Sequence, residues 1–267
     1  MTVCDAQIHL FPPGSEERAA RFGQRPMTEG EILAAMDGAG VDRAVLVPPN
    51  PDAAPASLAA ARAHPDRFFS LGHLSLKAPR SRAELAGWQA EGWAGVRVSF
   101  PPWHEQSWLR DGTAGWFWPL AEELGIRVAA WAPRQLSDLA EVARRHPGLH
   151  LVVDHLGLAV DDRDDALDAV LDELVPLAAL GNVAVKATSV TGHVTEGFPF
   201  PSLHARLWRV LDAFGPERVF WGTDLTRLEC SYAQAVALFA EELGLDPRSR
   251  GLVMGDALMA WLGEPRP

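Results

Sequence analysis

Three residues with catalytic side chains, His9, His155 and Asp224, each stand at the end of a short apolar run. The runs close with Gln-Ile-His at 7–9, Val-Asp-His at 153–155 and Trp-Gly-Thr-Asp at 221–224. Imidazole and carboxylate groups act as general acids and bases and as metal ligands. A single histidine in a strand is more often a core residue, and a single aspartate after a strand often caps the next helix. Three such residues at equivalent positions are better explained as one candidate active site.

Other polar residues alternate along the same runs. If residues 3–9 form a strand, its period of two puts every second side chain on one face, which we expect to point into the core. The groups that share a face are Asp5 with Gln7 and His9, Arg97 with Ser99, and Lys186 with Thr188. Arg97 and Lys186 have a structural alternative, because buried ion pairs use the same residue types.

Eight short apolar runs, several of them β-branched, have the pattern of strands that are buried on both faces. They span 3–9, 43–48, 68–76, 95–100, 126–132, 150–155, 183–189 and 219–224. Amphipathic segments alternate with them, over 28–40, 55–64, 82–91, 116–124, 135–146, 166–180, 203–214 and 232–243. Thr28, with Glu31 three residues later, has the spacing of a capping box. The segments rich in Pro and Gly, at 11–27, 48–55, 101–115 and 191–201, are expected to be connections.

Eight alternating units predict an α/β protein with a parallel sheet. One (β/α)8 TIM barrel needs about 250 residues, so the 267 residues fit a single barrel domain over 1–267. A doubly wound sheet is the alternative, but the chain has no glycine-rich phosphate-binding turn, which favours the closed barrel. Active sites of such barrels lie at the carboxyl ends of the strands, where we expect His9, His155 and Asp224 to meet.

The acidic composition restricts the class of partner. The formal net charge is −11, whereas nucleic acids and anionic membrane surfaces recruit basic proteins. The two cysteines are far apart, the first residues lack the features of a signal peptide, and no apolar run approaches the roughly 18 residues of a membrane span. We therefore expect a cytoplasmic protein that binds a small molecule rather than nucleic acid or membrane.

Basic and aromatic residues near the predicted strand ends are candidates for substrate binding. Arg97, Arg134 and Arg227 stand just inside or beyond a strand end, and an arginine can hold a carboxylate bidentately. The chain has ten Trp against one Tyr. Trp103 and Trp131 are candidates for an apolar wall against a ring, with core packing as the alternative for each.

The segments DAQIHLF, GVRVSF, VVDHLGLA, VAVKATS and VFWGTDLTRL, followed by MGDALMAWLG, resemble the amidohydrolase-2 branch of the amidohydrolase superfamily in order and spacing. The resemblance covers essentially the whole chain and implies a barrel hydrolase. Two positions depart from the family pattern. The branch usually opens with His-x-His, where this chain has Gln7 and His9. Metal-using relatives place a histidine at the end of strand five, where this chain has Trp131 between two alanines.

The resemblance extends to lactonases of sugar-acid lactones and pyrone dicarboxylates, some of which look like metal-free enzymes. It implies that Asp224 is the general base for water, that His9, His155 and Gln7 polarise the carbonyl, and that Arg97 binds a carboxylate. We predict hydrolysis of a cyclic ester or related acyl bond without a metal cofactor. The expected substrate is cyclic or aromatic with a carboxylate. Barrels of this type often form homodimers, but the sequence itself does not determine the oligomeric state.

Two alternatives stay open at this point. One is a zinc enzyme, either a metallohydrolase or a non-oxidative decarboxylase of an aromatic acid, with His9, His155 and Asp224 as the ligands of a single divalent ion. The other is a degenerate barrel that only binds its partner, which the altered metal positions suggest. His104 and His193, in two of the connections, can contact substrate, but we expect them to be surface loop residues.

Overall fold

The computed structural model describes residues 2–21, 23–101 and 105–264, with eight parallel strands that neighbour one another in chain order. They are β1 (Cys4–Ile8), β2 (Arg43–Leu46), β3 (Phe68–His73), β4 (Gly95–Ser99), β5 (Arg127–Trp131), β6 (His150–Val153), β7 (Val183–Ala187) and β8 (Val219–Trp221). All eight predicted strands are confirmed. Each ends one to three residues before its predicted boundary, because there the chain leaves the sheet and forms the loops that carry the polar side chains.

The two ends of the sheet meet. The backbone N–H of Asp224, just beyond β8, donates to the carbonyl of Gln7 in β1 at 2.9 Å. A Cβ on Gly222 would lie 2.7 Å from the backbone nitrogen of Ala6, so only glycine permits this close approach of the two segments. The eight strands therefore form a nearly closed barrel, as expected for the predicted (β/α)8 fold.

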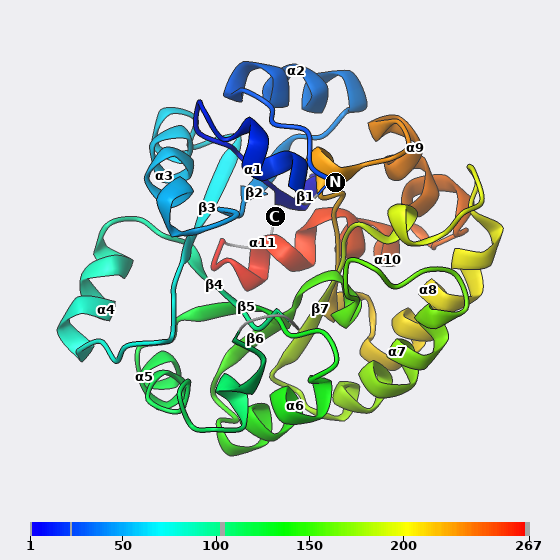
Figure 1. Cartoon of the computed structure of the whole chain (residues 1–267). Helices are drawn as coiled ribbons and strands as arrows, with labels where there is room; N and C mark the ends of the chain where they lie inside the picture. The colour runs from blue at the N-terminus through cyan, green and yellow to red at the C-terminus, as the bar shows by residue number, and fades with distance from the viewer. Residues whose placement is uncertain (1, 22, 102–104, 265–267) are drawn as a thin grey trace.

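Helices alternate with the strands and surround them (Figure 1). They are α1 (Glu16–Arg21), α2 (Glu29–Ala39), α3 (Ala54–Ala63), α4 (Arg82–Ala90), α5 (Phe117–Glu123), α6 (Leu136–Arg145), α7 (Ala166–Leu174), α8 (Pro201–Phe214), α9 (Tyr232–Ala237), α10 (Pro247–Gly251) and α11 (Ala257–Trp261). None of the helices in the described ranges combines the length and the apolar character that a membrane crossing needs.

The helix boundaries follow local sequence signals. The predicted capping box is present at the start of α2, since Thr28 and Glu31 each accept a backbone N–H of the other. The predicted helix over 166–180 is α-helical only to Leu174 and continues as a 3-10 turn, because Pro176 has no N–H for the helical ladder. The prediction that 11–27 is all connection was incomplete, since α1 lies within it.

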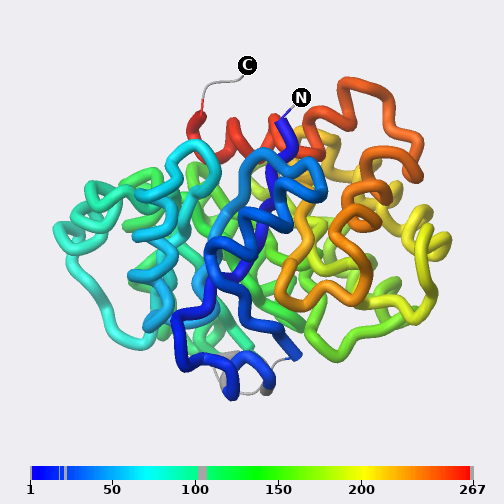
Figure 2. Tube along the Cα trace, turned by 90° about the horizontal axis from the view of Figure 1, so that it is seen from above, coloured from blue at the N-terminus to red at the C-terminus, as the bar shows by residue number. Residues whose placement is uncertain are grey.

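The interior of the barrel has an apolar half and a polar half. Toward the amino ends of the strands, Ala129, Val152, Ala184 and Phe220 pack with Leu258 of α11. Figure 2 shows α11 across that end of the barrel. Toward the carboxyl ends, several of the buried residues are charged or polar, among them Arg97, Asp154, Lys186 and Asp224. The sequence thus closes one end of the barrel with apolar contacts and places polar groups at the other.

Candidate active site

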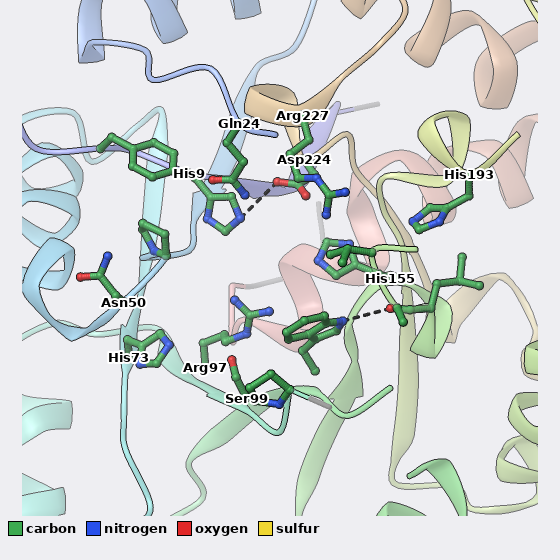
Figure 3. Close-up of a pocket in the computed structure, with 17 residues that line it drawn as sticks. His9, Gln24, Asn50, His73, Arg97, Ser99, His155, His193, Asp224 and Arg227 are labelled. Carbon is green, nitrogen blue, oxygen red and sulfur yellow. Dashed lines mark hydrogen bonds and ion pairs between the residues drawn. The ribbon is translucent and has the colours of Figure 1, made fainter. Parts of the chain in front are cut away.

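A cavity of about 400 Å³ opens at the carboxyl ends of the strands (Figure 3). Six of the nine residues predicted for the site line it: His9, Arg97, Trp131, His155, Asp224 and Arg227. Gln7 is buried beneath this lining, and Arg134 is exposed and lies outside it. The ninth, Trp103, lies outside the described residues, as does His104.

His9 and Asp224 form a buried pair on one wall of the cavity. Nε2 of His9 lies 3.2 Å from Oδ1 of Asp224, and both side chains are at most 5% exposed. Nδ1 of His9 lies 2.6 Å from the carbonyl oxygen of Val47, which can only accept, so Nδ1 carries a hydrogen. Nε2 therefore faces the carboxylate with a proton only when the ring is an imidazolium. A proton on Nε2 of His9 would thus lie between the imidazole and the Asp224 carboxylate, which both line the cavity.

The pKa of Asp224 lies below its ordinary value although the carboxyl group is buried. Burial alone would raise that pKa, but the charge of His9 and a hydrogen bond from it outweigh the desolvation. Asp224 therefore stays ionised at neutral pH. Its position on the cavity wall, rather than a high basicity, makes it a candidate general base.

The backbone takes an uncommon conformation at three of the strand ends that bear the site. His155, Ser189 and Asp224 have φ values of 53°, 61° and 57°, in the left-handed region. Such conformations cost roughly 1–3 kcal/mol for a residue other than glycine. The hydrogen bond from Asp224 to Gln7 helps to hold one of them. The conformation directs the His155 and Asp224 side chains into the cavity, as Figure 3 shows.

A chain of hydrogen bonds beneath the cavity fixes the state of His155. The Lys186 ammonium can only donate, and its Nζ lies 3.1 Å from Oε1 of Gln7. The amide nitrogen of Gln7 then donates to Nε2 of His155 at 3.1 Å. Nδ1 of His155 consequently carries the hydrogen and donates to the Thr188 hydroxyl at 2.9 Å. Burial lowers the pKa of His155 to about 4, against the attraction of Asp224 and Asp154, so the ring is neutral.

Two cations and one carboxylate lie below this chain. Asp154 is fully buried, with Lys186 Nζ at 2.9 Å and Arg97 Nε at 3.4 Å from its oxygens. Burial would raise the pKa of Asp154, but these cations lower it, so the carboxyl group remains charged. The predicted alternative of structural ion pairs is thus correct for Lys186. Arg97 has both roles, since it also lines the cavity beside Trp131, whose ring centre lies 5.8 Å from the guanidinium carbon.

The prediction that Asp5 shares a face with Gln7 and His9 was wrong. The pairing of β1 with β2 shifts register between Asp5 and Ile8, and such a bulge interrupts the alternation of side chains. Asp5 instead accepts hydrogen bonds from the Thr223 backbone N–H at 2.9 Å and the Tyr232 hydroxyl of α9 at 2.8 Å. It therefore ties β1 to the chain beyond β8 and does not face the cavity.

Two histidines of the cavity were misjudged or missed. His193 is 2% exposed and lines the cavity, so the expectation of a surface loop residue was wrong. His73, at the end of β3, lines the cavity with a buried Nδ1 that has no hydrogen-bond partner. Burial lowers the pKa of His73 to about 3. The same criterion that found His9, a polar residue closing an apolar strand, would have found His73.

Arg134 is turned away from the cavity. Its guanidinium lies 3.4 Å from Asp161 and 3.3 Å from Asp162, in the loop after β6. It therefore supports that loop instead of facing the substrate. Arg227, Gln24 and Asn50 supply the further polar lining, the last two without any signal in the sequence analysis.

The donor set does not fit a zinc ion held by three protein ligands. Of the three candidate ligands, Oδ1 of Asp224 and Nε2 of His9 face each other at 3.2 Å. The third candidate, Nε2 of His155, accepts the Gln7 amide. Over the described ranges, no three His, Cys, Asp or Glu residues are grouped to share a metal. Zinc sites in hydrolases use three protein ligands, so we derive no step through a metal.

Comparison with known sequences places the chain in a family. The model of the amidohydrolase family matches residues 4–257. The protein named L-fucono-1,5-lactonase in Burkholderia multivorans is 30% identical over 219 residues, which cover 74% of this chain and 72% of that protein. Its namesake in Burkholderia ambifaria is 29% identical over 165 residues, which cover 58% and 53% of the two chains.

Comparison with solved structures gives the same fold. A crystal structure of an amidohydrolase from B. multivorans with bound zinc has a TM-score of 0.86 at 21% identity, over 99% of this chain and all of the other. A putative 2-pyrone-4,6-dicarboxylic acid hydrolase from Pseudomonas putida has a TM-score of 0.78 at 24% identity, over 98% and 97%. At these identities the likeness is one of fold. The family match and the lactonase relatives together show that the chain belongs to the amidohydrolase family and is an enzyme, a hydrolase of the lactonase-like kind.

Proposed function

We propose that the chain hydrolyses a cyclic ester, with Asp224 as the base that takes a proton from water. The observation that carries the proposal is the His9–Asp224 pair, 3.2 Å apart, on the wall of a cavity that also holds a guanidinium. Similarity to proteins named L-fucono-1,5-lactonase supports a lactone as the substrate.

In the proposed reaction the water oxygen attacks the lactone carbonyl carbon while Asp224 takes one water proton. The bond between that carbon and the ring oxygen then breaks, and His9 gives its Nε2 proton to the departing alkoxide. The proton on Asp224 passes to His9, 3.2 Å away, which restores the starting state. One water is consumed, and the product is an open-chain hydroxy acid that loses its carboxyl proton to solvent.

Cationic donors stabilise the charge that develops on the carbonyl oxygen. The His9 ring, in the protonated form that the proposed proton transfer requires, and the Arg97 guanidinium both line the cavity, and Figure 3 shows both directed into it. Loss of one such donor typically lowers the rate about 10²–10³-fold. Gln7 has a different role from the one predicted, because both ends of its amide are engaged by Lys186 and His155. We assign Gln7 and His155 as positioning residues that keep this wall neutral and fixed.

The remaining lining suits a ring with a polar or acidic substituent. The indole nitrogen of Trp131 donates to the Leu158 carbonyl at 3.0 Å, which holds the ring at the cavity wall. Val160 extends this apolar side, and Arg227 supplies a cation for an acidic group. The proposal includes no metal cofactor, since Nε2 of His155, the third of the metal ligands considered from the sequence, accepts the Gln7 amide.

The test is turnover of a panel of five- and six-membered lactones, with and without hydroxyl and carboxyl substituents, followed by acid release. Asp224→Asn should keep the melting temperature within a few degrees and lower kcat by about 10²–10⁴, the usual range for loss of a general base. Asp138, on α6 and paired with Arg110 away from the cavity, provides the matched control Asp138→Asn. Near wild-type turnover by the Asp224 variant would show that Asp224 serves only the local structure.

A further inference from the structure

His193 is a buried side chain of the cavity that the proposed mechanism does not use. It lies in the turn after β7, is 2% exposed and lines the cavity beside His155 and Arg227. Figure 3 shows its ring directed toward the centre of the cavity. The loops after β6 and β7 hold it in place, because Asp164 N donates to the His193 carbonyl at 2.8 Å.

The tautomer of His193 follows from its backbone partner. Nδ1 lies 2.8 Å from the carbonyl oxygen of Asp162, which can only accept, so Nδ1 carries a hydrogen. The carboxylate of the same residue accepts the backbone N–H of Ala159 at 2.7 Å, which fixes the loop that presents this carbonyl. Nε2 of a neutral His193 therefore has a lone pair and no hydrogen.

The ring stays neutral in this environment. Burial lowers the pKa of His193, and the positive charges of Arg163 and Arg227 act in the same direction, against the bond to Asp162. The cavity thus contains a fixed acceptor near the cation of Arg227. An anionic substituent would be repelled by the lone pair and attracted by the arginine, whereas a hydroxyl group can donate to the lone pair.

We propose that His193 is a specificity-determining residue, which accepts a hydrogen bond at Nε2 from a ring hydroxyl of the substrate. The inference rests on the proposed lactone hydrolysis and narrows the substrate to a hydroxylated ring. A ring without that hydroxyl leaves a buried acceptor unpaired, and this costs binding in the transition state. The acceptor also orients the ring, because acidic or carbonyl oxygens are then directed to the arginines.

The kinetic test compares the hydroxylated six-membered lactone that is turned over fastest with δ-valerolactone, which lacks hydroxyls. His193→Leu should lower kcat/KM for the hydroxylated lactone ~10-fold and for δ-valerolactone less than ~2-fold, the difference being one hydrogen bond. His193→Gln should restore most of the loss, because its amide can donate to the Asp162 carbonyl and accept from the substrate. His204→Leu, at a histidine on α8 that also bonds a backbone carbonyl, is the control and should change neither value. Equal losses on the two lactones would overturn the proposal.

A binding measurement separates this inference from the proposed function. The ¹⁵N resonance of His193 Nε2 is followed in the wild-type protein on addition of anhydroglucitol, a hydroxylated ring without an ester, and of tetrahydropyran. A hydrogen bond to Nε2 moves the resonance with anhydroglucitol alone. No shift, or the same shift with both rings, counts against His193 as the acceptor even if lactones are hydrolysed. A selective shift without turnover of any lactone retains the acceptor and refutes the hydrolysis.

Discussion

The substitution Gln7→Glu tests the hydrogen-bond chain that fixes the state of the site. The glutamine amide donates to Nε2 of His155 at 3.1 Å, so the imidazole is neutral and Nε2 is unprotonated. A carboxylate of the same size has no hydrogen to donate. Its second oxygen would face the His155 lone pair, and a proton on Nε2 is what relieves the repulsion. We therefore expect His155 to become an imidazolium.

The size of the effect follows from the distance. A unit negative charge at 3.1 Å stabilises the imidazolium by ~5 kcal/mol at an effective dielectric constant of about 20. This corresponds to a rise of about four in pKa, from about 4 to roughly 8 for His155. The positive charge that His155 gains lowers the pKa of Asp224 and makes that carboxylate a weaker base. We therefore expect kcat to fall about tenfold or more at neutral pH.

The assay is ¹⁵N NMR of His155 across pH 5–9, together with kcat at the same pH values. Lys186→Met in the wild-type background is the companion variant, because it removes the donor that fixes the orientation of the Gln7 amide. If His155 stays neutral at pH 7 in Gln7→Glu, the assigned directions of the hydrogen bonds from Lys186 through Gln7 and His155 to Thr188 are refuted. It would then follow that the amide or the ring is oriented differently from what the hydrogen bonds indicate.

Three further predictions address stability, metal and anion binding. The pKa values of His155 and His73 in the folded protein are about 4 and about 3, below the ordinary 6.5, so both take up protons on unfolding. Asp5, whose pKa is raised by burial to about 6, opposes this over a narrower range. The free energy of unfolding from urea titrations should therefore fall as the pH decreases from about 6.5 to 4, and a flat or rising profile would contradict the pKa shifts. Treatment with a chelator should leave activity unchanged, and Gln7→His should raise neither metal content nor turnover; activity that is lost on stripping and restored by stoichiometric zinc would overturn the metal-free proposal. Arg227→Met should raise KM for lactones that carry a carboxylate about tenfold or more without a similar rise for neutral ones, since a charged hydrogen bond contributes roughly 1.5–3 kcal/mol, and equal rises would exclude a role in anion binding.

The amino-acid pattern was enough to predict the eight strands and their arrangement in one parallel barrel. Runs such as AVLVP and LVVD, buried on both faces, have the signal of a parallel sheet. Since all carboxyl ends of a parallel barrel lie on one side, the positions of His9, His155 and Asp224 at strand ends were enough to predict that they meet. The observed 3.2 Å between His9 and Asp224 agrees with that reasoning.

Contacts between residues far apart in the sequence determine the hydrogen-bond partners and the orientation of the polar side chains in the site. Gln7 was expected to face the substrate, but Lys186 and His155, 179 and 148 residues away, engage both ends of its amide. No local pattern contains that information, because the partners of a polar side chain depend on which strands neighbour one another. The bulge in β1 that turns Asp5 outward has the same origin, since it depends on the pairing of β1 with β2 and not on a residue type.

The loops around the cavity also separate what the local sequence predicts from what tertiary contacts determine. His193 stands in a stretch rich in polar residues and glycine, a composition typical of exposed connections. It is buried because the loops after β6 and β7 bond to each other, through Asp162 and Asp164, across the mouth of the barrel. Arg134 was expected to bind the substrate, but its guanidinium pairs with Asp162 in the loop after β6 and lies outside the cavity. Sequence periodicity thus located the site, because periodicity is local, whereas the protonation and direction of each side chain depended on tertiary contacts that periodicity does not encode.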